Sequence, residues 1–256
     1  MNPAHQQLRT PVRFEWGPVG ASALRGSSIS VVVDVLSFTT TLSVAADLGI
    51  EVLPYRWRDD SASEYADAHD ALLAVGRSEA EQGAVSLSPN TIRNAVGVRR
   101  LVLPSPNGSS IAYSLAASST VCIGACVRNA AAVGTWIAEH YEDGTDVSVI
   151  AAGERWLDRS LRPCVEDLWG AGAVLAELMR LRSELTASVE AEAAVAAWNT
   201  VRNRFGAALE DCASGQELIA AGYRSDVLVA AEVGESTAVP VLVDNRFIDR
   251  SSVPKA

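Results

Sequence analysis

An acidic residue at the end of a buried strand is the first feature of this sequence that could carry chemistry. The β-branched run 29–33 leads into Asp34, and the threonines at 39, 40 and 41 then open a helical pattern. A buried parallel strand has this composition, and the helix start that follows exposes free backbone N–H groups. A carboxylate can bind a hard metal ion, while hydroxyl and N–H groups suit a phosphate. The pattern indicates a site for a phosphate-bearing ligand, or an aspartate that merely accepts turn amides.

A second strand-to-helix junction carries glycine and hydroxyl groups. The segment Pro104-Ser105-Pro106-Asn107-Gly108-Ser109-Ser110 follows a predicted strand and precedes a predicted helix. Glycine between hydroxyl residues lets backbone amides approach an oxyanion closely. An ordinary Asn-Gly turn, with Ser109 as the helix cap, accounts for the same residues.

A third group pairs acids with a base. Glu154 and Arg155 come just after a predicted strand, and Glu166 and Asp167 open a long predicted helix. Neighbouring helix positions point about 100° apart, so we expect at most one of the two adjacent acids to face a pocket. Acids in a first turn also stabilise the helix dipole without any catalytic role.

A cysteine gives an alternative nucleophile. Cys122 and Arg128 have the C-x5-R spacing of cysteine phosphatases, although Gly124 stands one place earlier than in the usual loop. In such enzymes a low-pKa thiolate attacks phosphorus while the arginine holds the oxygens. A cysteine within an apolar strand is more often a small hydrophobic residue.

The composition limits the classes of partner. The chain has 256 residues, is 48% apolar and carries a formal charge of −10, which disfavours nucleic acid but allows a small anionic ligand in a local pocket. The first thirteen residues are polar and no long apolar run occurs, so neither a signal peptide nor a membrane span is expected. The four cysteines match no zinc pattern, and a cytoplasmic protein with reduced thiols is the expectation.

Strand and helix signals alternate along most of the chain. Strands are predicted at 29–34, 51–54, 72–75, 100–103, 120–123, 147–151, 226–230 and 239–243. Helices are predicted at 39–49, 61–71, 109–117, 129–140, 165–204 with a break near 183–186, and 207–222. Residues 152–164 are predicted to form a polar loop. Alternation of this kind implies an α/β fold with a largely parallel sheet and right-handed crossovers. We therefore predict one domain over 1–256, with a helical segment at about 165–222.

Taken in order, these segments resemble the 2-phosphosulfolactate phosphatase family, the coenzyme M pathway enzyme also called ComB. The resemblance spans nearly the whole chain. It depends on the order and spacing of the matching segments and not on any single motif. The matching segments are Val31–Leu36 with Thr39–Thr41, Pro106–Ser109, Arg128–Val133, Ala151–Gly153, Glu166-Asp167 with Ala171-Gly172, Ser225–Val227 and Val239-Pro240.

The resemblance implies a three-layer α/β/α fold with a mostly parallel sheet, and Mg²⁺-dependent hydrolysis of a small phosphomonoester. It implies that Asp34, Glu166 and Asp167 bind the metal ion, and that Asp34, Glu154 and Arg155 take part in catalysis. The substrate would be bound by Thr39, Thr40, Asn107, Gly108, Ser109, Arg77, Arg128 and Asn129. Two routes stay open, since either water or the Asp34 carboxylate could attack phosphorus.

The sequence also departs from the family pattern. Ser37 stands where the family usually has an arginine, and the Gly76–Pro89 stretch has an altered G-E-R segment. A substrate with several anionic groups calls for several arginines. A second hypothesis is therefore a non-catalytic relative that binds an anionic ligand, and the third is the cysteine-dependent phosphatase at Cys122.

A homodimer is a further expectation. The alanine-rich tract 187–198 carries long apolar faces that self-association could bury. Packing of the same faces on the chain's own sheet is the alternative.

Overall fold

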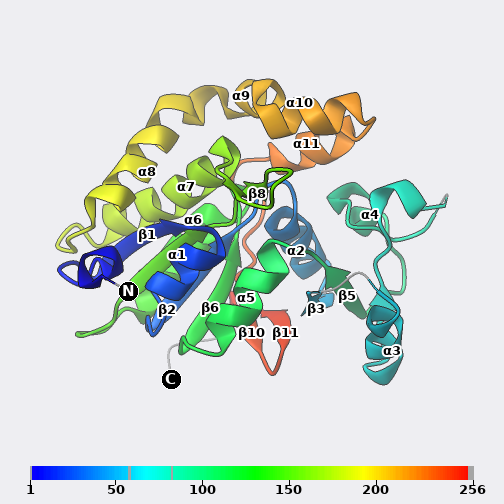
Figure 1. Ribbon diagram of the computed structural model, residues 1–256, viewed down its shortest axis with the longest axis horizontal. Helices are drawn as coiled ribbons and strands as arrows, with labels where there is room; N and C mark the ends of the chain where they lie inside the picture. Colours follow the sequence, from blue (N-terminus) through cyan, green and yellow to red (C-terminus); the bar gives the residue numbers. More distant parts are fainter. Residues whose placement is uncertain (1, 57–58, 82, 253–256) are drawn as a thin grey trace.

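The fold is built on a long twisted sheet (Figure 1), seen in a computed structural model that describes residues 2–56, 59–81 and 83–252. Within these residues the sheet has nine strands in the order β1-β7-β2-β6-β10-β11-β3-β5-β4. Their bounds are β1 Val12–Trp16, β2 Ile29–Val33, β3 Glu51–Tyr55, β4 Leu72–Leu73, β5 Arg100–Pro104, β6 Val121–Ala125, β7 Val147–Ala151, β10 Pro240–Val243 and β11 Arg246–Asp249. A separate antiparallel pair, β8 (Glu154–Arg155) and β9 (Leu161–Arg162), forms a small hairpin.

The sheet consists of two parallel blocks joined by an antiparallel hairpin. One block contains β1, β7, β2 and β6, and the other contains β3, β5 and β4. The β10–β11 hairpin lies between them and pairs antiparallel with β6 on one side and β3 on the other. Three successive antiparallel pairings make the two blocks run in opposite directions. Most of the strand pairings are nevertheless parallel, which confirms the predicted fold class.

Sheet twist brings the ends of the two blocks toward each other. A sheet twists by about 20–25° per strand, so the five steps from β2 to β5 rotate the strand direction by roughly 100–125°. This rotation offsets much of the reversal between the blocks. The carboxyl end of β5 can therefore approach the carboxyl end of β2, and the candidate site lies where they meet.

Helices cover both faces of the sheet and form the outer layers. Alternating residues of β2 show the two faces: Val31 and Val33 belong to one buried cluster and Val32 to the other. On the Val32 side lie α1 (Gly17–Ala23), α2 (Phe38–Asp47) and α5 (Gly108–Ala116); on the Val31 side lie α6 (Ala130–His140), α7 (Val165–Leu181) and α8 (Val189–Val201). The arrangement is the three-layer α/β/α fold that the resemblance implied.

The remaining helices are short. They are α3 (Ser61–Ala68), α4 (Pro89–Arg93), α9 (Phe205–Asp211), α10 (Ala213–Ala220) and α11 (Arg224–Ala230), with 3-10 turns at Pro3–Gln6, Arg77–Glu79 and Arg202–Arg204. Within the described residues, no helix has both the length and the apolar character needed to cross a bilayer.

Three predictions about these elements are wrong. Residues 207–222 form two helices instead of one, residues 152–164 contain the β8–β9 hairpin instead of a plain loop, and Asp226–Ala230 is helix α11 instead of a strand. The run 226–230 is apolar and β-branched, and such short runs do not distinguish a strand from a buried helix. Leu228 is 46% exposed while Val227 and Val229 are buried, and α11 packs on α4 and α10. Sequence analysis also missed β1, α1 and β11.

The alanine-rich tract packs within the chain. Helix α8 lies along α7 and β1, and its residues Ala191, Ala194 and Trp198 are buried there. The two helices come very close at Gly172 of α7, where an added Cβ would lie 2.1 Å from the carbonyl oxygen of Ala194. Small residues in this tract therefore serve a helix contact inside the chain.

Replacement of Gly172 by alanine should destabilise the protein. The new methyl group cannot fit against the α8 backbone without moving a helix, and overpacking of this kind costs about 1–3 kcal/mol. The measurement is the midpoint of urea unfolding. Gly206→Ala in α9 is the matched control, because its Cβ would meet only Ala231 at 3.8 Å and the helix would gain propensity. Equal midpoints for the two variants would contradict the close α7–α8 contact.

Candidate active site

Asp34 lies directly after β2 and is almost fully buried. Its Oδ1 accepts a hydrogen bond from the backbone N–H of Phe38 (3.2 Å), and its Oδ2 accepts one from the backbone N–H of Gly108 (3.0 Å). Phe38 begins α2 and Gly108 begins α5. The carboxylate therefore sits between the N-termini of two helices, where the helix dipoles favour negative charge.

Gly108 is needed for this close approach. A Cβ at this position would lie 2.7 Å from the Asp34 carboxylate and 2.3 Å from the ring of Phe38. The sequence prediction assigned Gly108 to phosphate binding. In the structure its amide instead holds a carboxylate, and it joins the end of β5 to the end of β2.

A second buried carboxylate joins the same edge of the sheet. Asp167, in the first turn of α7, accepts hydrogen bonds from the backbone N–H groups of Val35 (2.7 Å) and Gly153 (2.8 Å). These two residues lie just beyond the ends of β2 and β7. The neighbouring Glu166 is also buried, and the thiol of Cys212 lies 3.6 Å from its Oε2.

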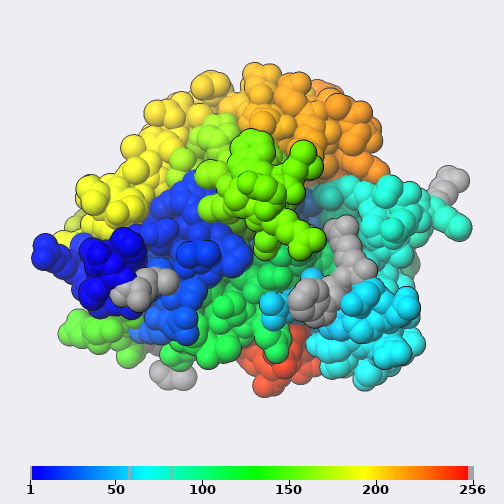
Figure 2. Space-filling model, in the orientation of Figure 1, coloured from blue at the N-terminus to red at the C-terminus, as the bar shows by residue number. Residues whose placement is uncertain are grey.

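The acids surround two adjoining cavities, of about 110 Å³ and 300 Å³. Both are lined by Asp34, Leu36, Arg77, Asn107 and Glu154. The larger one extends toward α10 and includes both Glu166 and Asp167, so the expectation that only one of these acids faces the pocket is wrong. The segment with the β8–β9 hairpin stands out at the centre of the face in Figure 2, beside the helices α9 and α10.

Burial of these acids changes their proton affinity. Burial, with the charges of Glu154 and Glu166, raises the pKa of Asp34 to about 7 against the opposing hydrogen bonds from Phe38 and Gly108. Burial, then the charges of Glu166 and Asp34, raises the pKa of Asp167 well above its usual value. In the described part of the chain, no arginine or lysine forms an ion pair with these acids. A group of buried acids without a cation favours binding of a proton or a positive ion.

The described residues contain no ready-made metal cage. Within them, no three His, Cys, Asp or Glu side chains come close enough together to form a metal-binding group. Asp34 and Asp167 each use both carboxylate oxygens to accept backbone amides, which fixes their orientation. A Mg²⁺ ion bound here would need only one or two of the carboxylates, since Mg²⁺ commonly keeps water and phosphate oxygens as its other ligands.

Arg77 lines both cavities, and its guanidinium is held firmly. Its Nε donates to Oδ2 of Asp226 at 2.8 Å, and one terminal nitrogen donates to the hydroxyl of Ser37. Asp226 is fully buried in α11 and also accepts a hydrogen bond from the hydroxyl of Ser88. A buried carboxylate that accepts from Nε leaves a guanidinium with a fixed orientation at the wall of the cavity.

Three of the predicted phosphate-binding hydroxyls have other partners. Thr39 donates to the carbonyl of Asp34, Thr40 to that of Val35, and Ser109 to that of Leu103. All three side chains are fully buried. They hold the two strand-to-helix junctions in place, and the structure does not present their hydroxyls to the cavity.

Arg128 and Asn129 lie away from the pocket. The Arg128 guanidinium is buried and contacts Ser43 (2.6 Å), Asp47 (3.1 Å) and Glu232 (3.1 Å). Asn129 accepts from the backbone N–H of Cys126 and donates to the carbonyls of Gly124 and Ala238. Neither lines the Asp34 cavities, and their contacts tie the β6–α6 junction to the segment before β10.

Of the two adjacent residues predicted to be catalytic, Glu154 and Arg155, only the first lines the cavities. The Glu154 carboxylate lines both cavities and accepts a hydrogen bond from the Asn107 amide at 2.9 Å. Arg155 is exposed on β8 and does not line either cavity. Successive residues of a strand point to opposite sides, so the hairpin that brings Glu154 inward turns Arg155 outward.

The cysteine alternative does not fit the geometry. Cys122 lies in the middle of a sheet between helices, and burial raises the pKa of its thiol to about 12. A phosphatase nucleophile needs a thiolate near neutral pH. Arg128, its supposed partner, is held by Asp47 and Glu232.

Several pocket residues were missed. Ser37 lines the smaller cavity, and Arg162 and Tyr223 line the larger one; Asp226 and Ser88, which hold Arg77 without lining either cavity, were missed as well. The sequence did contain a signal for Asp226. It is the one charged residue in the apolar run 226–230, and a charged side chain that is buried needs a partner.

The three-layer fold, with buried acids and a held arginine around one cavity, has the character of an α/β enzyme that binds an anionic substrate. The chain belongs to the 2-phosphosulpholactate phosphatase family, whose sequence model matches residues 20–245. It is 29% identical over 217 residues to a probable 2-phosphosulfolactate phosphatase of Thermus thermophilus, covering 84% of this chain and 87% of that protein. It is 28% identical over 222 residues to the 2-phosphosulfolactate phosphatase of Methanothermobacter thermautotrophicus, covering 87% and 90%. The resemblance read from the sequence is confirmed, and the chain is an enzyme of a phosphatase family.

Folding stability in EDTA should fall as the pH rises from 5 to 8. The pKa of Asp34 is about 7 when folded, against about 3.9 for an unfolded aspartate, so the folded protein binds this proton more tightly. Its contribution is complete below pH 4 and is lost as the pH rises through 7. About two pKa units of this difference are lost between pH 5 and 8, so at about 1.4 kcal/mol per unit the loss is on the order of 3 kcal/mol.

The measurement is the free energy of urea unfolding at several pH values, for the unmodified protein and for Asp34→Asn. Asp34→Asn also removes the charge that helps to raise the pKa of Asp167, so the difference between the two curves reports Asp34 together with its coupling to Asp167. Parallel curves would contradict the raised pKa.

Proposed function

We propose that this chain hydrolyses a small phosphomonoester with further anionic groups, of the 2-phosphosulfolactate type, in a Mg²⁺-dependent reaction. The observation that carries the proposal is the pairing, around one cavity, of buried carboxylates without a cation and a guanidinium fixed by Asp226. The names of the family and of its two relatives support the substrate class.

The position of each residue in the site suggests its role in the reaction. Asp34 and one of Glu166 and Asp167 would hold Mg²⁺, which when bound neutralises phosphoryl oxygens and polarises the P–O bond. Arg77 lines the same cavities and would bind a phosphate or sulfonate oxygen pair. The N–H groups at the start of α2 and α5 are used by Asp34, so they fix the carboxylate instead of the substrate.

Hydrolysis breaks the ester P–O bond and joins a water oxygen to phosphorus, and the leaving alkoxide takes a proton. Glu154 is the candidate for that proton transfer, because its carboxylate lines the cavity and is oriented by Asn107. Attack by water and attack by the Asp34 carboxylate both agree with this arrangement, the second route passing through an acyl phosphate.

Phosphate release from racemic 2-phosphosulfolactate should require both Mg²⁺ and Asp34. We expect EDTA or Asp34→Asn to lower the rate by about a thousandfold or more, since each removes charge stabilisation at phosphorus. Cys122→Ala is the matched control and should keep its rate within about twofold, because that thiol is buried and protonated. A rate that is unchanged by EDTA but lost in Cys122→Ala would contradict the proposal and favour the cysteine-dependent phosphatase.

No turnover by a folded protein that still binds Mg²⁺ would favour the second hypothesis, a non-catalytic relative. The motivation for that hypothesis is Ser37 in place of the family's arginine. In the structure the Ser37 hydroxyl accepts a hydrogen bond from Arg77, so a guanidinium group is present at this position of the pocket after all. This contact favours retained activity.

Asp226→Asn should weaken substrate binding more than turnover. The asparagine keeps the size of the side chain and can still accept from Arg77, but the charge that holds the guanidinium is lost. We expect KM to rise about tenfold and kcat to change less than threefold, measured by initial rates of phosphate release. Arg93→Gln, which removes an exposed ion pair with Glu232, is the control and should leave both constants unchanged. A fall in kcat without a rise in KM would contradict a positioning role.

A cytoplasmic location and a homodimer stay predictions.

A further inference from the structure

The β8–β9 hairpin brings a second arginine to the candidate active site. Arg162 of β9 is paired with Glu154 of β8, and residues opposite each other in an antiparallel pair point to the same side. Both side chains line the larger cavity, whereas the other pair of the hairpin, Arg155 and Leu161, lines neither cavity. The side of the hairpin that carries Glu154 and Arg162 therefore belongs to the site.

Leu161 fixes the hairpin from its other side. A Cβ at Gly17 would lie 3.0 Å from the Leu161 side chain, and a Cβ at Gly153 would lie 2.8 Å from it. Gly17 follows β1 directly, and Gly153 lies just beyond β7. The leucine thus packs closely where these two strands end, and this contact keeps Arg162 at the cavity.

The guanidinium of Arg162 is positioned by the protein, and its capacity to bind an anion remains. Its one ion pair among the described residues is with Glu217 at 3.4 Å, and the Glu217 side chain is 72% exposed, so this pair is weak. The guanidinium carbon lies 5.8 Å from the centroid of the Trp156 ring, in cation–π contact. A guanidinium has several N–H donors, and the contact with Glu217 uses one of its nitrogens.

Arg162 lies in a different part of the site from Arg77. Asp34, Arg77 and Glu154 line both cavities, and under the function proposed above the phosphoryl group lies beside them. Arg162 lines only the larger cavity. Among the described residues that line the larger cavity and not the smaller one, it is the one positive group.

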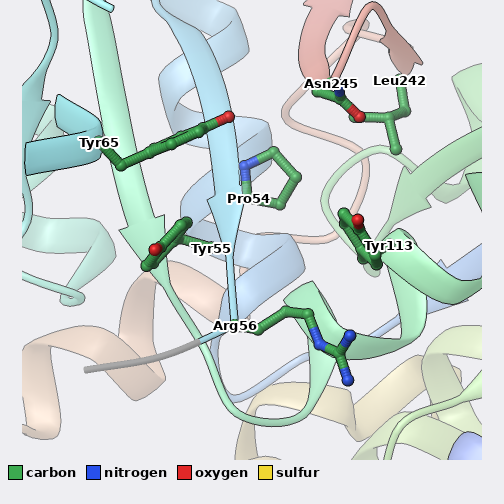
Figure 3. Close-up of a pocket in the computed structure, with 7 residues that line it drawn as sticks. All are labelled: Pro54, Tyr55, Arg56, Tyr65, Tyr113, Leu242 and Asn245. Atoms are coloured by element: carbon green, nitrogen blue, oxygen red, sulfur yellow. The ribbon is translucent and has the colours of Figure 1, made fainter. Parts of the chain in front are cut away.

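The larger cavity is the space available for the rest of the substrate. Its volume is about 300 Å³, against about 110 Å³ for the smaller one. The cavity at the end of β3, lined by Tyr55, Tyr65 and Tyr113 (Figure 3), shares no lining residue with either of them. A substrate of the 2-phosphosulfolactate type carries a sulfonate and a carboxylate besides its phosphate, so at least one of these acidic groups would lie in the larger cavity.

We propose that Arg162 determines substrate specificity by binding a second acidic group, a sulfonate or a carboxylate, of the phosphomonoester. Each of these groups presents oxygens that a guanidinium can bind through two parallel N–H donors. The inference rests on the proposed function, because the second group is defined relative to the phosphate that is hydrolysed.

Three phosphate esters that differ by one acidic group at a time test this role. 2-Phosphosulfolactate carries a sulfonate and a carboxylate, 2-phospholactate keeps only the carboxylate, and isopropyl phosphate has neither. We expect Arg162→Gln to raise KM for 2-phosphosulfolactate at least tenfold with less than a threefold change in kcat, and to leave kcat/KM for isopropyl phosphate within twofold. A similar rise in KM for 2-phospholactate would assign the carboxylate to Arg162, and an unchanged KM would assign the sulfonate.

Two further variants separate binding from support of the hairpin. Arg159→Gln removes a positive charge from the exposed turn of the same hairpin, outside both cavities, and should leave the constants for all three esters unchanged. Arg162→Lys keeps the charge and loses the paired donors. Its KM for 2-phosphosulfolactate should therefore lie between those of the unmodified protein and Arg162→Gln.

Calorimetric titration with sulfolactate in the presence of Mg²⁺ separates this inference from the proposed function, because it needs no turnover. Arg162→Gln should weaken sulfolactate binding at least tenfold and leave the binding of inorganic phosphate within twofold. With this result, a failure to release phosphate from 2-phosphosulfolactate would contradict the proposed hydrolysis and still support Arg162 as the ligand of the second acidic group.

Three results would overturn the role of Arg162. One is an equal loss for all three esters and for inorganic phosphate, because Arg162 would then bind the phosphoryl group or support the hairpin. Another is an Arg162→Gln variant with unchanged KM values and unchanged sulfolactate binding. The third is an unmodified protein that neither hydrolyses 2-phosphosulfolactate nor binds sulfolactate, which would overturn the proposed function as well.

Discussion

Two buried carboxylates join the carboxyl ends of β2, β5 and β7. Asp34 ties the end of β2 to the starts of α2 and α5, and Asp167 ties the same strand end to Gly153 beyond β7. Both acids keep their positions by accepting backbone N–H groups, and no cation of the described chain offsets their charge. These hydrogen bonds therefore fix the loops that follow β2, β5 and β7. Burial of the two acids without a cation raises their pKa values and favours the binding of a positive ion.

The order of the elements could be read from the sequence because most of the strands are short apolar runs bounded by turns. The same pattern predicted the position of Asp34, because an acid that directly follows a buried strand lies at the carboxyl-terminal edge of the sheet. The meeting of Asp34 with Gly108 could not be predicted. It depends on the opposite directions of the two blocks and on the twist between them, which are properties of strand pairing across the whole sheet.

Side-chain roles were harder to predict than side-chain locations. Thr39, Thr40 and Ser109 lie at the expected junctions, yet their hydroxyls serve backbone carbonyls because buried polar groups need partners. The resemblance implied that Arg128 binds the substrate, but its guanidinium pairs with Asp47, the last residue of α2, and with Glu232. Arg77 lines both cavities, and its role in substrate binding stays a prediction. Its partner Asp226 was missed because the sequence of α11 resembles that of a strand.

The hairpin between the two blocks has a consequence for how the chain is made. The strands β10 and β11 follow every other strand in the sequence, yet they occupy the middle of the sheet. A nascent chain can pair β1, β7, β2 and β6, and separately β3, β5 and β4, but until the hairpin emerges from the ribosome β6 and β3 remain unpaired edges. Open edges of this kind recruit strands from other chains. Synthesis of this protein thus passes through a stage in which aggregation competes with insertion of its last hairpin.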